Sequence, residues 1–271
     1  MDKNISVIIT LYKTPHDKLQ LLKQYKNYKI IIFDQDSKNN KKIISNILKK
    51  KFKYFYSKKN IGLSKSTNFL ISKVKTKFFL FTQADIEIDK ISILNLLKII
   101  KSKKDVIFVA PMLGRPSKRK LTKKKYIYSN KLDASIMLCD LKKVKKLGFF
   151  DENFFLYWED IDLMKRVKES KFKMIKVLNS YAKHYGGKST VENYKTKIVR
   201  KTNFKYGEFI FDLKYNKLRL LKIVRTLIQS IIFIPIYLIF FDQDKLINRY
   251  SNLIGTIKFL FFFISKRNNT I

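Results

Sequence analysis

Short apolar runs alternate with longer amphipathic stretches through the first 110 residues of the chain. The apolar runs are rich in Ile, Val, Phe and Tyr, which is typical of buried strands; they cover 6–10, 29–33, 53–57, 78–82 and 106–110. Stretches with helical spacing of apolar residues lie at 16–26, 40–50, 63–74 and 90–101, the last opening at Asp89 as a helix cap. This alternation predicts an α/β fold in which helices connect the strands of a mostly parallel sheet.

The pattern changes after residue 114. Residues 115–125, RPSKRKLTKKK, have no apolar period and predict a basic loop, and residues 126–140 read as extended chain. A short helix ending at Gly148 follows, and then an acidic segment. A further strand is predicted at 171–178 and a loop at 182–189.

Two apolar runs near the end of the chain, 227–241 and 254–264, predict a helical tail. A membrane-spanning helix needs about 20 apolar residues, and both runs are shorter. Three interpretations stay open: interfacial or re-entrant helices, a true span, or ordinary packing on the rest of the protein. We expect a catalytic domain over residues 1–215 and a basic, membrane-associating helical tail over 216–271.

Polar residues follow three of the predicted strands: Thr10 and Tyr12 at the first, Asp34 at the second and Asp85 after the fourth. Ligands of such sheets bind at the carboxyl ends of the strands. Asp34 is either a turn residue or an acceptor for a nucleobase. Asp85 is either a turn residue or a carboxylate that holds a divalent cation on a diphosphate.

The segment NIGLSKSTN, residues 60–68, joins the third strand to a helix. Gly62 permits a close backbone approach there, and a helix N-terminus favours a phosphate, although a bare loop explains the glycine equally well. His184, one of two histidines, is either a surface residue or a metal ligand.

Six carboxylates lie in FFDENFFLYWEDIDLMKRVKE, residues 149–169, and raise a question about their role. A helix dipole stabilises acids in the first turn, which accounts for some of them. The aromatic residues Tyr157 and Trp158 beside Glu159 and Asp160 favour a second interpretation, in which one acid is a catalytic base facing a ring.

The chain has 59 Lys and Arg against 21 Asp and Glu, for a formal net charge of +38. The basic residues are spread over nearly every segment, which favours compositional bias with attraction to anionic membranes as a by-product, rather than nucleic acid as the main ligand. The single cysteine, Cys139, excludes an intrachain disulfide, suits a reducing compartment and lies in an apolar run typical of packing.

Six segments, in this order, resemble family-2 glycosyltransferases of the GT-A fold, and most closely bacterial rhamnosyltransferase-like members. They are SVIITLY, IIIFDQDS, NIGLSKSTN, FFLFTQADIEI, LGFFDENFFLYWEDIDLMKR and KHYGGKS, within residues 4–190.

The resemblance implies sugar transfer with inversion, from a nucleotide-sugar donor to a hydroxyl of an acceptor. It implies a donor site, a divalent cation (Mg²⁺ or Mn²⁺), a base and an acceptor side. By position these are Thr10, Tyr12 and Asp34 for the nucleoside; Asn60, Gly62 and Asn68 for the donor; Asp85 and His184 for the metal; Asp160 for the base; and Trp158 and Glu159 for the acceptor.

The sequence departs from the family pattern in two places. Gln83 replaces the first acid of the family's DxD metal motif, with Ala84 between it and Asp85. Ala134–Ser135 and Cys139–Asp140 replace residues common in relatives on the acceptor side.

We therefore expect an enzyme that builds a cell-surface glycan or lipid-linked glycan, peripheral or monotopic on the cytoplasmic face of the inner membrane, with no nucleic-acid partner. The alternatives within the fold are transfer of an N-acetylhexosamine or galactofuranose from a UDP donor. Alternatives of other classes are a basic nucleic-acid-binding protein and an inactive membrane scaffold.

Overall fold

The computed structural model describes residues 4–35, 39–114 and 124–268. Contacts divide the chain into two compact units. The first contains Met1–Phe150 and Leu163–Val191, and the second contains Asp151–Asp162 and Glu192–Ile271. The expected boundary at residue 215 falls inside the second unit, and the greater part of the predicted basic loop, 115–123, lies outside the described residues.

The first unit is built on a mixed sheet whose parallel half follows the predicted strands. Parallel pairing gives the order β3-β2-β1-β4. These strands are β1 (Ile5–Leu11), β2 (Lys29–Gln35), β3 (Lys53–Ser57) and β4 (Phe78–Thr82). The helical crossovers predicted by the alternating pattern are what make this half parallel.

The other half of the sheet is largely antiparallel, because strand–helix alternation stops near residue 113. The order continues β8-β6-β9-β5, with β7 paired to β9. Within it, β6 and β9 pair in parallel and the other pairings are antiparallel. The strands are β5 (Ile86–Ile88), β6 (Val106–Leu113), β7 (Tyr126–Tyr128), β8 (Ile136–Asp140) and β9 (Lys173–His184).

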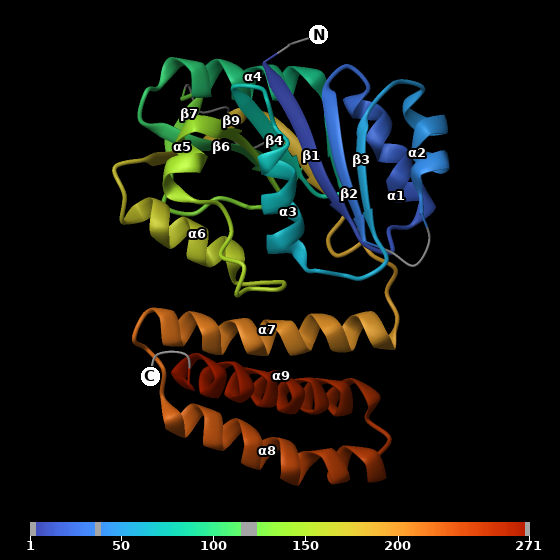
Figure 1. Cartoon of the computed structure of the whole chain (residues 1–271), viewed down its shortest axis with the longest axis vertical. Coiled ribbons are helices and arrows are strands. Elements are labelled where there is room, and N and C mark those ends of the chain that lie inside the picture. Colours follow the sequence, from blue (N-terminus) through green and yellow to red (C-terminus); the bar gives the residue numbers. More distant parts are fainter. Residues whose placement is uncertain (1–3, 36–38, 115–123, 269–271) are drawn as a thin grey trace. The chain divides into compact units, whose positions relative to one another are not determined.

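Helices cover both faces of this sheet (Figure 1). Because successive side chains of a strand point to opposite faces, Phe78 and Leu80 join one core cluster while Phe79 and Phe81 join the other. The first cluster packs against α1 (His16–Gln20), the 3₁₀ helix η1 (Leu21–Tyr25), α2 (Lys41–Leu48) and α4 (Lys90–Ser102). The second packs against α3 (Leu63–Ser72), α5 (Leu141–Leu147) and the part of α6 (Glu159–Lys168) that begins at Leu163.

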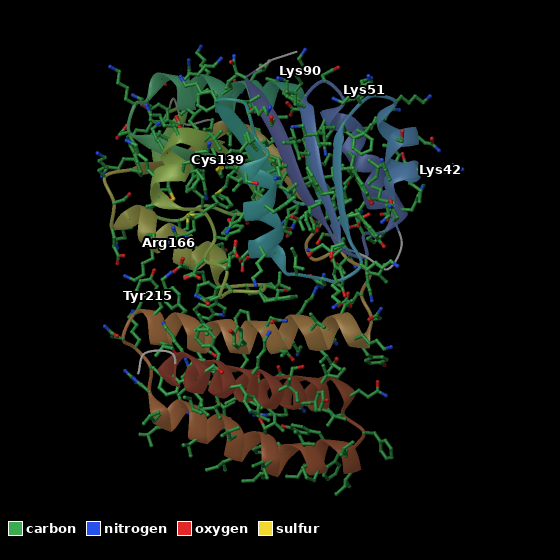
Figure 2. The ribbon with its side chains drawn as sticks, in the orientation of Figure 1. Lys42, Lys51, Lys90, Cys139, Arg166 and Tyr215 are labelled. Atoms are coloured by element: carbon green, nitrogen blue, oxygen red, sulfur yellow. The ribbon has the colours of Figure 1, made fainter. Side chains whose placement is uncertain are left out.

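Several local predictions are confirmed by side-chain contacts. The Asp89 carboxylate accepts a hydrogen bond from the backbone N–H of Ser92 at 2.7 Å, which caps α4. Gly148 ends α5 with φ +79°, a conformation that favours glycine. Cys139 is fully buried in β8, consistent with a packing role, and it lies in the interior of the unit (Figure 2).

The second unit is a helical layer with the segment 151–162 attached to it. Its helices are α7 (Tyr194–Lys214), α8 (Leu220–Ile239) and α9 (Gln243–Asn268), with α9 between the other two (Figure 1). The Phe209 and Phe259 rings pack 5.2 Å apart between α7 and α9. Gly255 brings α9 against α7 so closely that a Cβ there would lie 2.6 Å from the carbonyl oxygen of Thr202.

Candidate active site

Asp34 is fully buried at the carboxyl end of β2, where the sequence predicted a nucleoside contact. One of its oxygens, Oδ2, accepts hydrogen bonds from the Tyr54 hydroxyl at 2.6 Å and from the side-chain amide of Asn40 at 3.0 Å. Burial and then this carboxylate raise the pKa of Tyr54, so that its hydroxyl stays a donor. The Asp34 side chain is thus oriented by two neighbours before any ligand binds.

Thr10, Gln35 and Ser66 form a polar cluster near Asp34, in which Gln35 and Ser66 are buried and Thr10 is half-buried. The Thr10 Oγ1 lies 3.2 Å from the Ser66 Oγ, which donates to the carbonyl oxygen of Gly62 at 2.6 Å. Gln35 accepts from the backbone N–H of Ile61 at 2.9 Å. These contacts fix the turn between β3 and α3 against the ends of β1 and β2.

Gly62 adopts φ +87° in that turn, and the Asn60 side chain accepts its N–H at 2.9 Å. A residue with a Cβ is strained at such a φ, so the turn requires glycine. Asn68 lies further along α3 and exchanges two hydrogen bonds with the backbone of Phe150, at 2.8 and 3.2 Å. Tyr12 follows β1 and is half-buried.

Asp85 and His184 are brought together by antiparallel pairing of β5 with β9, in which Ile86 lies opposite His184. The His184 Nε2 lies 3.5 Å from Oδ2 of the fully buried Asp85. The same oxygen accepts the backbone N–H of Lys188 at 3.0 Å. The prediction that His184 lies in a loop is wrong, because β9 continues through it.

The donor set of this pair fits a divalent cation. The second Asp85 oxygen, Oδ1, is buried and makes no hydrogen bond to a described residue. A carboxylate oxygen and an imidazole nitrogen are both ligands that Mn²⁺ accepts. Among the described residues no cluster of three or more His, Cys, Asp or Glu gathers as a metal site, so a cation held here would complete its coordination with diphosphate oxygens and water.

The two groups shift each other's pKa in opposite directions. Burial alone would raise the pKa of Asp85, but the hydrogen bond and charge of His184 and the N–H of Lys188 outweigh it, and the net pKa lies below the usual range. The hydrogen bond to Asp85 raises the pKa of His184, against the effect of its own burial, and the charge of Asp133 adds to the rise. Asp85 is therefore ionised at neutral pH, as a metal ligand must be.

In the acidic segment, Tyr157 and Trp158 both adopt left-handed backbone conformations, with φ of 68° and 70°. Each such conformation costs a residue with a Cβ about 1–2 kcal/mol, so packing must hold the pair in place. The Trp158 ring packs against Phe211 at 5.3 Å and Phe204 at 5.6 Å, both on α7. Gly207 makes room for it: a Cβ at that position would lie 2.9 Å from the Trp158 Cδ1.

The three acids that open α6 have different surroundings. Asp162 is fully buried, lies 2.6 Å from the Lys214 amine and accepts a hydrogen bond from the Tyr215 hydroxyl at 2.9 Å. Glu159 is also buried, and burial followed by the charge of Asp160 raises its pKa to about 8. Asp160 is half-buried, and its Oδ1 accepts the N–H of Ile161 at 2.9 Å.

The family assignment follows from comparison with known sequences. Residues 6–163, more than half of the chain, match the family described as glycosyl transferase family 2. The chain belongs to glycosyl transferase family 2. The resemblance to family-2 glycosyltransferases found in its sequence is thereby confirmed. Comparison with curated proteins gives no match.

Solved structures similar to this glycosyltransferase show the same fold. GalNAc-T7 with UDP, GalNAc and Mn²⁺ matches 75% of the chain with a TM-score of 0.55 at 15% identity, and the chain spans 47% of it. The mannosyltransferase PcManGT from Pyrobaculum calidifontis, in complex with GDP-Man and Mn²⁺, matches 78% with a TM-score of 0.56 at 13% identity, with 64% of it spanned. Residues 1–349 of S. aureus TarS match 94%, and 91% of that structure is spanned, with a TM-score of 0.53 at 15% identity.

Sequence reasoning missed several residues that support the candidate site. Ser66 interrupts the apolar stripe of α3 at an inward position, and that interruption was a usable signal of a polar role. Tyr54 and Lys188 gave no signal, because each meets its carboxylate only through strand pairing or a turn. Nothing in the sequence indicated that Tyr157 and Trp158 are left-handed, since neither is a residue type that favours this conformation.

Proposed function

We propose that this glycosyltransferase moves a rhamnose-like sugar from a dTDP- or UDP-sugar onto a hydroxyl of a growing cell-surface glycan or lipid-linked acceptor, with inversion at C1. The observation that carries the proposal is the pairing of Asp85 with His184, a carboxylate and an imidazole 3.5 Å apart in the sheet unit. Asp34, Thr10 and Gly62, at the ends of β1 and β2 and the start of α3, supply the donor side. The resemblance to rhamnosyltransferase-like members supports the sugar.

Asp85 and His184 would hold the cation, which supplies Lewis-acid stabilisation of the charge on the departing nucleoside diphosphate. The chain's own residues act on the acceptor. Its hydroxyl oxygen bonds to C1 as the bond from C1 to the phosphate oxygen breaks, and the hydroxyl proton passes to a carboxylate. The nucleoside diphosphate leaves with the bonding electrons.

Asp160 is the acid best suited to take that proton. Glu159, with a pKa of about 8, is already largely protonated at neutral pH and serves instead to orient the acceptor by donating a hydrogen bond. Asp162 is engaged by Lys214 and Tyr215. Trp158, which is half-buried, packs with Phe204 and Phe211 beside these acids, and an acceptor ring would pack against this aromatic cluster.

Transfer assays on Asp160→Asn and Glu159→Gln test the proposal, with exposed Glu152→Gln in the same segment as the matched control. Asp160→Asn should lower kcat by about 10²–10⁴, the usual contribution of a positioned base, and leave donor affinity unchanged. If Glu159→Gln is inactive and Asp160→Asn is active, the base is Glu159 and not Asp160. Activity in both would show that the segment is only a helix start.

A second arm of the same assay removes the metal. EDTA should abolish transfer in the wild type, Mn²⁺ should restore it, and Asp85→Ala should reproduce the loss. A thermal-shift panel of nucleotide sugars with and without Mn²⁺ identifies the donor, because a bound ligand raises stability according to its affinity. If UDP-N-acetylhexosamine or UDP-galactofuranose gives the largest shift, that sugar and not rhamnose is the one transferred. Donor binding without transfer to any acceptor would indicate an inactive scaffold.

We also propose that the reaction takes place at the cytoplasmic face of the inner membrane. Among the residues that the structure describes, one helix, α8, is long and apolar enough to cross a bilayer. The large excess of basic residues supports attraction to anionic lipid.

A further inference from the structure

Helix α8 presents an exposed face made of apolar residues. Side chains three and four residues apart lie on one side of a helix, and six apolar residues on this side of α8 are each at least 49% exposed. They are Leu221, Val224, Ile228, Ile231, Ile232 and Ile239. Only 17% of the most apolar part of this 20-residue helix is buried inside the protein.

The opposite face of α8 packs on α9. Ile223, Thr226 and Ser230 are buried there, and the two hydroxyls are satisfied by carbonyl oxygens one turn earlier in α8. The helices are antiparallel: Lys245 lies over the Tyr237 ring at 5.7 Å, while Arg249 lies over the Phe233 ring at 5.2 Å. Arg249 also donates to the side-chain oxygen of Gln229 at 3.0 Å.

This pairing decides between spanning a bilayer and lying on it. If α8 crossed, the first half of α9 would enter the hydrocarbon with it, including Asp244, Lys245 and Arg249. Each of these charges costs about 2.5–3.5 kcal/mol at the centre of a membrane helix. Arg249 would lie close to the bilayer centre, because its partners Gln229 and Phe233 are in the middle of α8. An in-plane position avoids this cost by keeping α9 on the water side.

The charge of the chain selects lipid over a second copy as the partner of this face. Two copies would each bring a formal net charge of +38 to their contact and repel each other. An anionic bilayer attracts the same charge, and Lys217, Arg219 and Arg225 are exposed before and in the first turns of α8.

We propose that α8 binds an anionic phospholipid bilayer as an in-plane helix. Its apolar face lies in the acyl boundary, about 5–10 Å below the surface, and α9 lies above it in water. The proposal deepens the membrane part of the proposed function. Its test uses no sugar donor, so that failure here leaves the transfer assay untouched.

Depth-dependent fluorescence quenching in the full-length protein tests the geometry. Cys139 is buried, so a label can be placed at one introduced cysteine at a time: Val224→Cys, Ile232→Cys, Ile239→Cys and, on α9, Asn248→Cys. The vesicles contain phosphatidylcholine and phosphatidylglycerol in equal parts, with quenchers at defined depths. We expect the three α8 labels at one shallow depth and the α9 label in water.

A spanning helix gives a different result. Its rise of 1.5 Å per residue would place the label at 232 about 12 Å deeper than the label at 224, with the label at 248 also deep. Either of these results, or no lipid quenching at any α8 position, would overturn the proposal.

A matched pair of double variants tests the face itself by vesicle sedimentation. Ile228→Asp with Ile232→Asp should reduce the partition coefficient at least tenfold. Ile91→Asp with Leu94→Asp places the same change on exposed apolar residues of α4 and should have no effect. Transfer to a soluble acceptor should survive in both. Equal loss of vesicle binding in the two variants would show that total charge, not this face, holds the protein on the membrane.

Discussion

Glu159 and Asp160 are neighbours in the sequence but differ in burial, and burial determines the protonation of Glu159. A carboxyl group removed from water keeps its proton, since the charged form loses its hydration. At 5% exposure Glu159 has a pKa of about 8, against an ordinary value of 4.5. At neutral pH the pair therefore contains one largely neutral donor, and two adjacent negative charges are avoided.

This difference predicts how stability depends on pH. The raised pKa means that folded Glu159 holds its proton where unfolded Glu159 has lost it, so its contribution is fully present below about pH 4.5 and is lost as pH rises through about 8. Glu159→Gln keeps the neutral shape and should be more stable than the wild type at pH 8, by an amount on the order of a few kcal/mol. Urea unfolding at a series of pH values checks this. Parallel pH profiles for the variant and the wild type would show that Glu159 is ionised in the folded state.

The sequence indicated several functional residues, but it did not predict which side chains would surround them. Asp85 and His184 were paired by resemblance to a family, and the structure brings their side chains together through β5 and β9. Asp162, two residues after Asp160, is fully buried with Lys214 and Tyr215 as partners. These partners lie more than 50 residues away, beyond the range of any local pattern.

At the scale of elements, the short segment before α6 depends on a notch in α7. The notch is the space at Gly207, where α7 has no side chain. Tyr157 and Trp158 hold their left-handed conformations while the Trp158 ring lies over Gly207. Because α6 begins at Glu159, directly after Trp158, the notch also fixes the position of Glu159 and Asp160. Residues 157–160 and α7, which are far apart in the sequence, therefore hold one another in place within the second unit.

Gly207→Ala tests this contact. In a helix interior the change ordinarily stabilises a protein by about 0.5–1 kcal/mol. Here the new Cβ would meet the Trp158 Cδ1 at 2.9 Å and the Tyr157 carbonyl oxygen at 3.1 Å, so we expect a net loss of about 1–3 kcal/mol and a lower kcat. In a Trp158→Leu background the same change should become neutral or stabilising, and thermal unfolding of all four proteins measures the coupling. A stabilising Gly207→Ala in the wild type would show that the notch has room to spare.

Elements were predictable from sequence where the pattern is local. The strands β3 and β4 have the predicted bounds, and α4 begins at its predicted cap. By contrast, β9 runs on to His184, beyond the predicted end at residue 178. Polar residues interrupt its pattern, and they are satisfied by tertiary contacts such as Ser180 donating to the carbonyl oxygen of Ser92 at 3.0 Å. A polar residue buried by a distant partner looks like the end of a strand in the sequence.

At the scale of the whole molecule, the chain divides where its sequence gives no break. Residues 151–162 belong with the helical unit although they interrupt the sheet unit in the sequence. Lys214 holds this segment through ion pairs of 2.6 Å with both Asp151 and Asp162. The composition of the segment, rich in acids and aromatic residues, does not reveal which lysine among so many is its partner. A membrane-bound second unit would carry Glu159 and Asp160 with it.

The net charge and the apolar face of α8 together predict a salt response that separates membrane from nucleic acid. Raising the salt from about 0.1 M to about 1 M shortens the screening length from about 10 Å to about 3 Å, which weakens every contact that depends on charge alone. Binding to random-sequence DNA should fall steeply and vanish, because it rests on phosphate contacts and counterion release. Binding to anionic vesicles should fall at first and then level off, since apolar burial is not weakened by salt.

The vesicle binding that remains at about 1 M salt should disappear in the Ile228→Asp, Ile232→Asp double variant and persist in the Ile91→Asp, Leu94→Asp control. Sedimentation with vesicles and fluorescence anisotropy with DNA, over one salt series, measure both partners. DNA binding that resists about 1 M salt would restore nucleic acid as the main ligand, and vesicle binding that vanishes with it would remove the role given to α8.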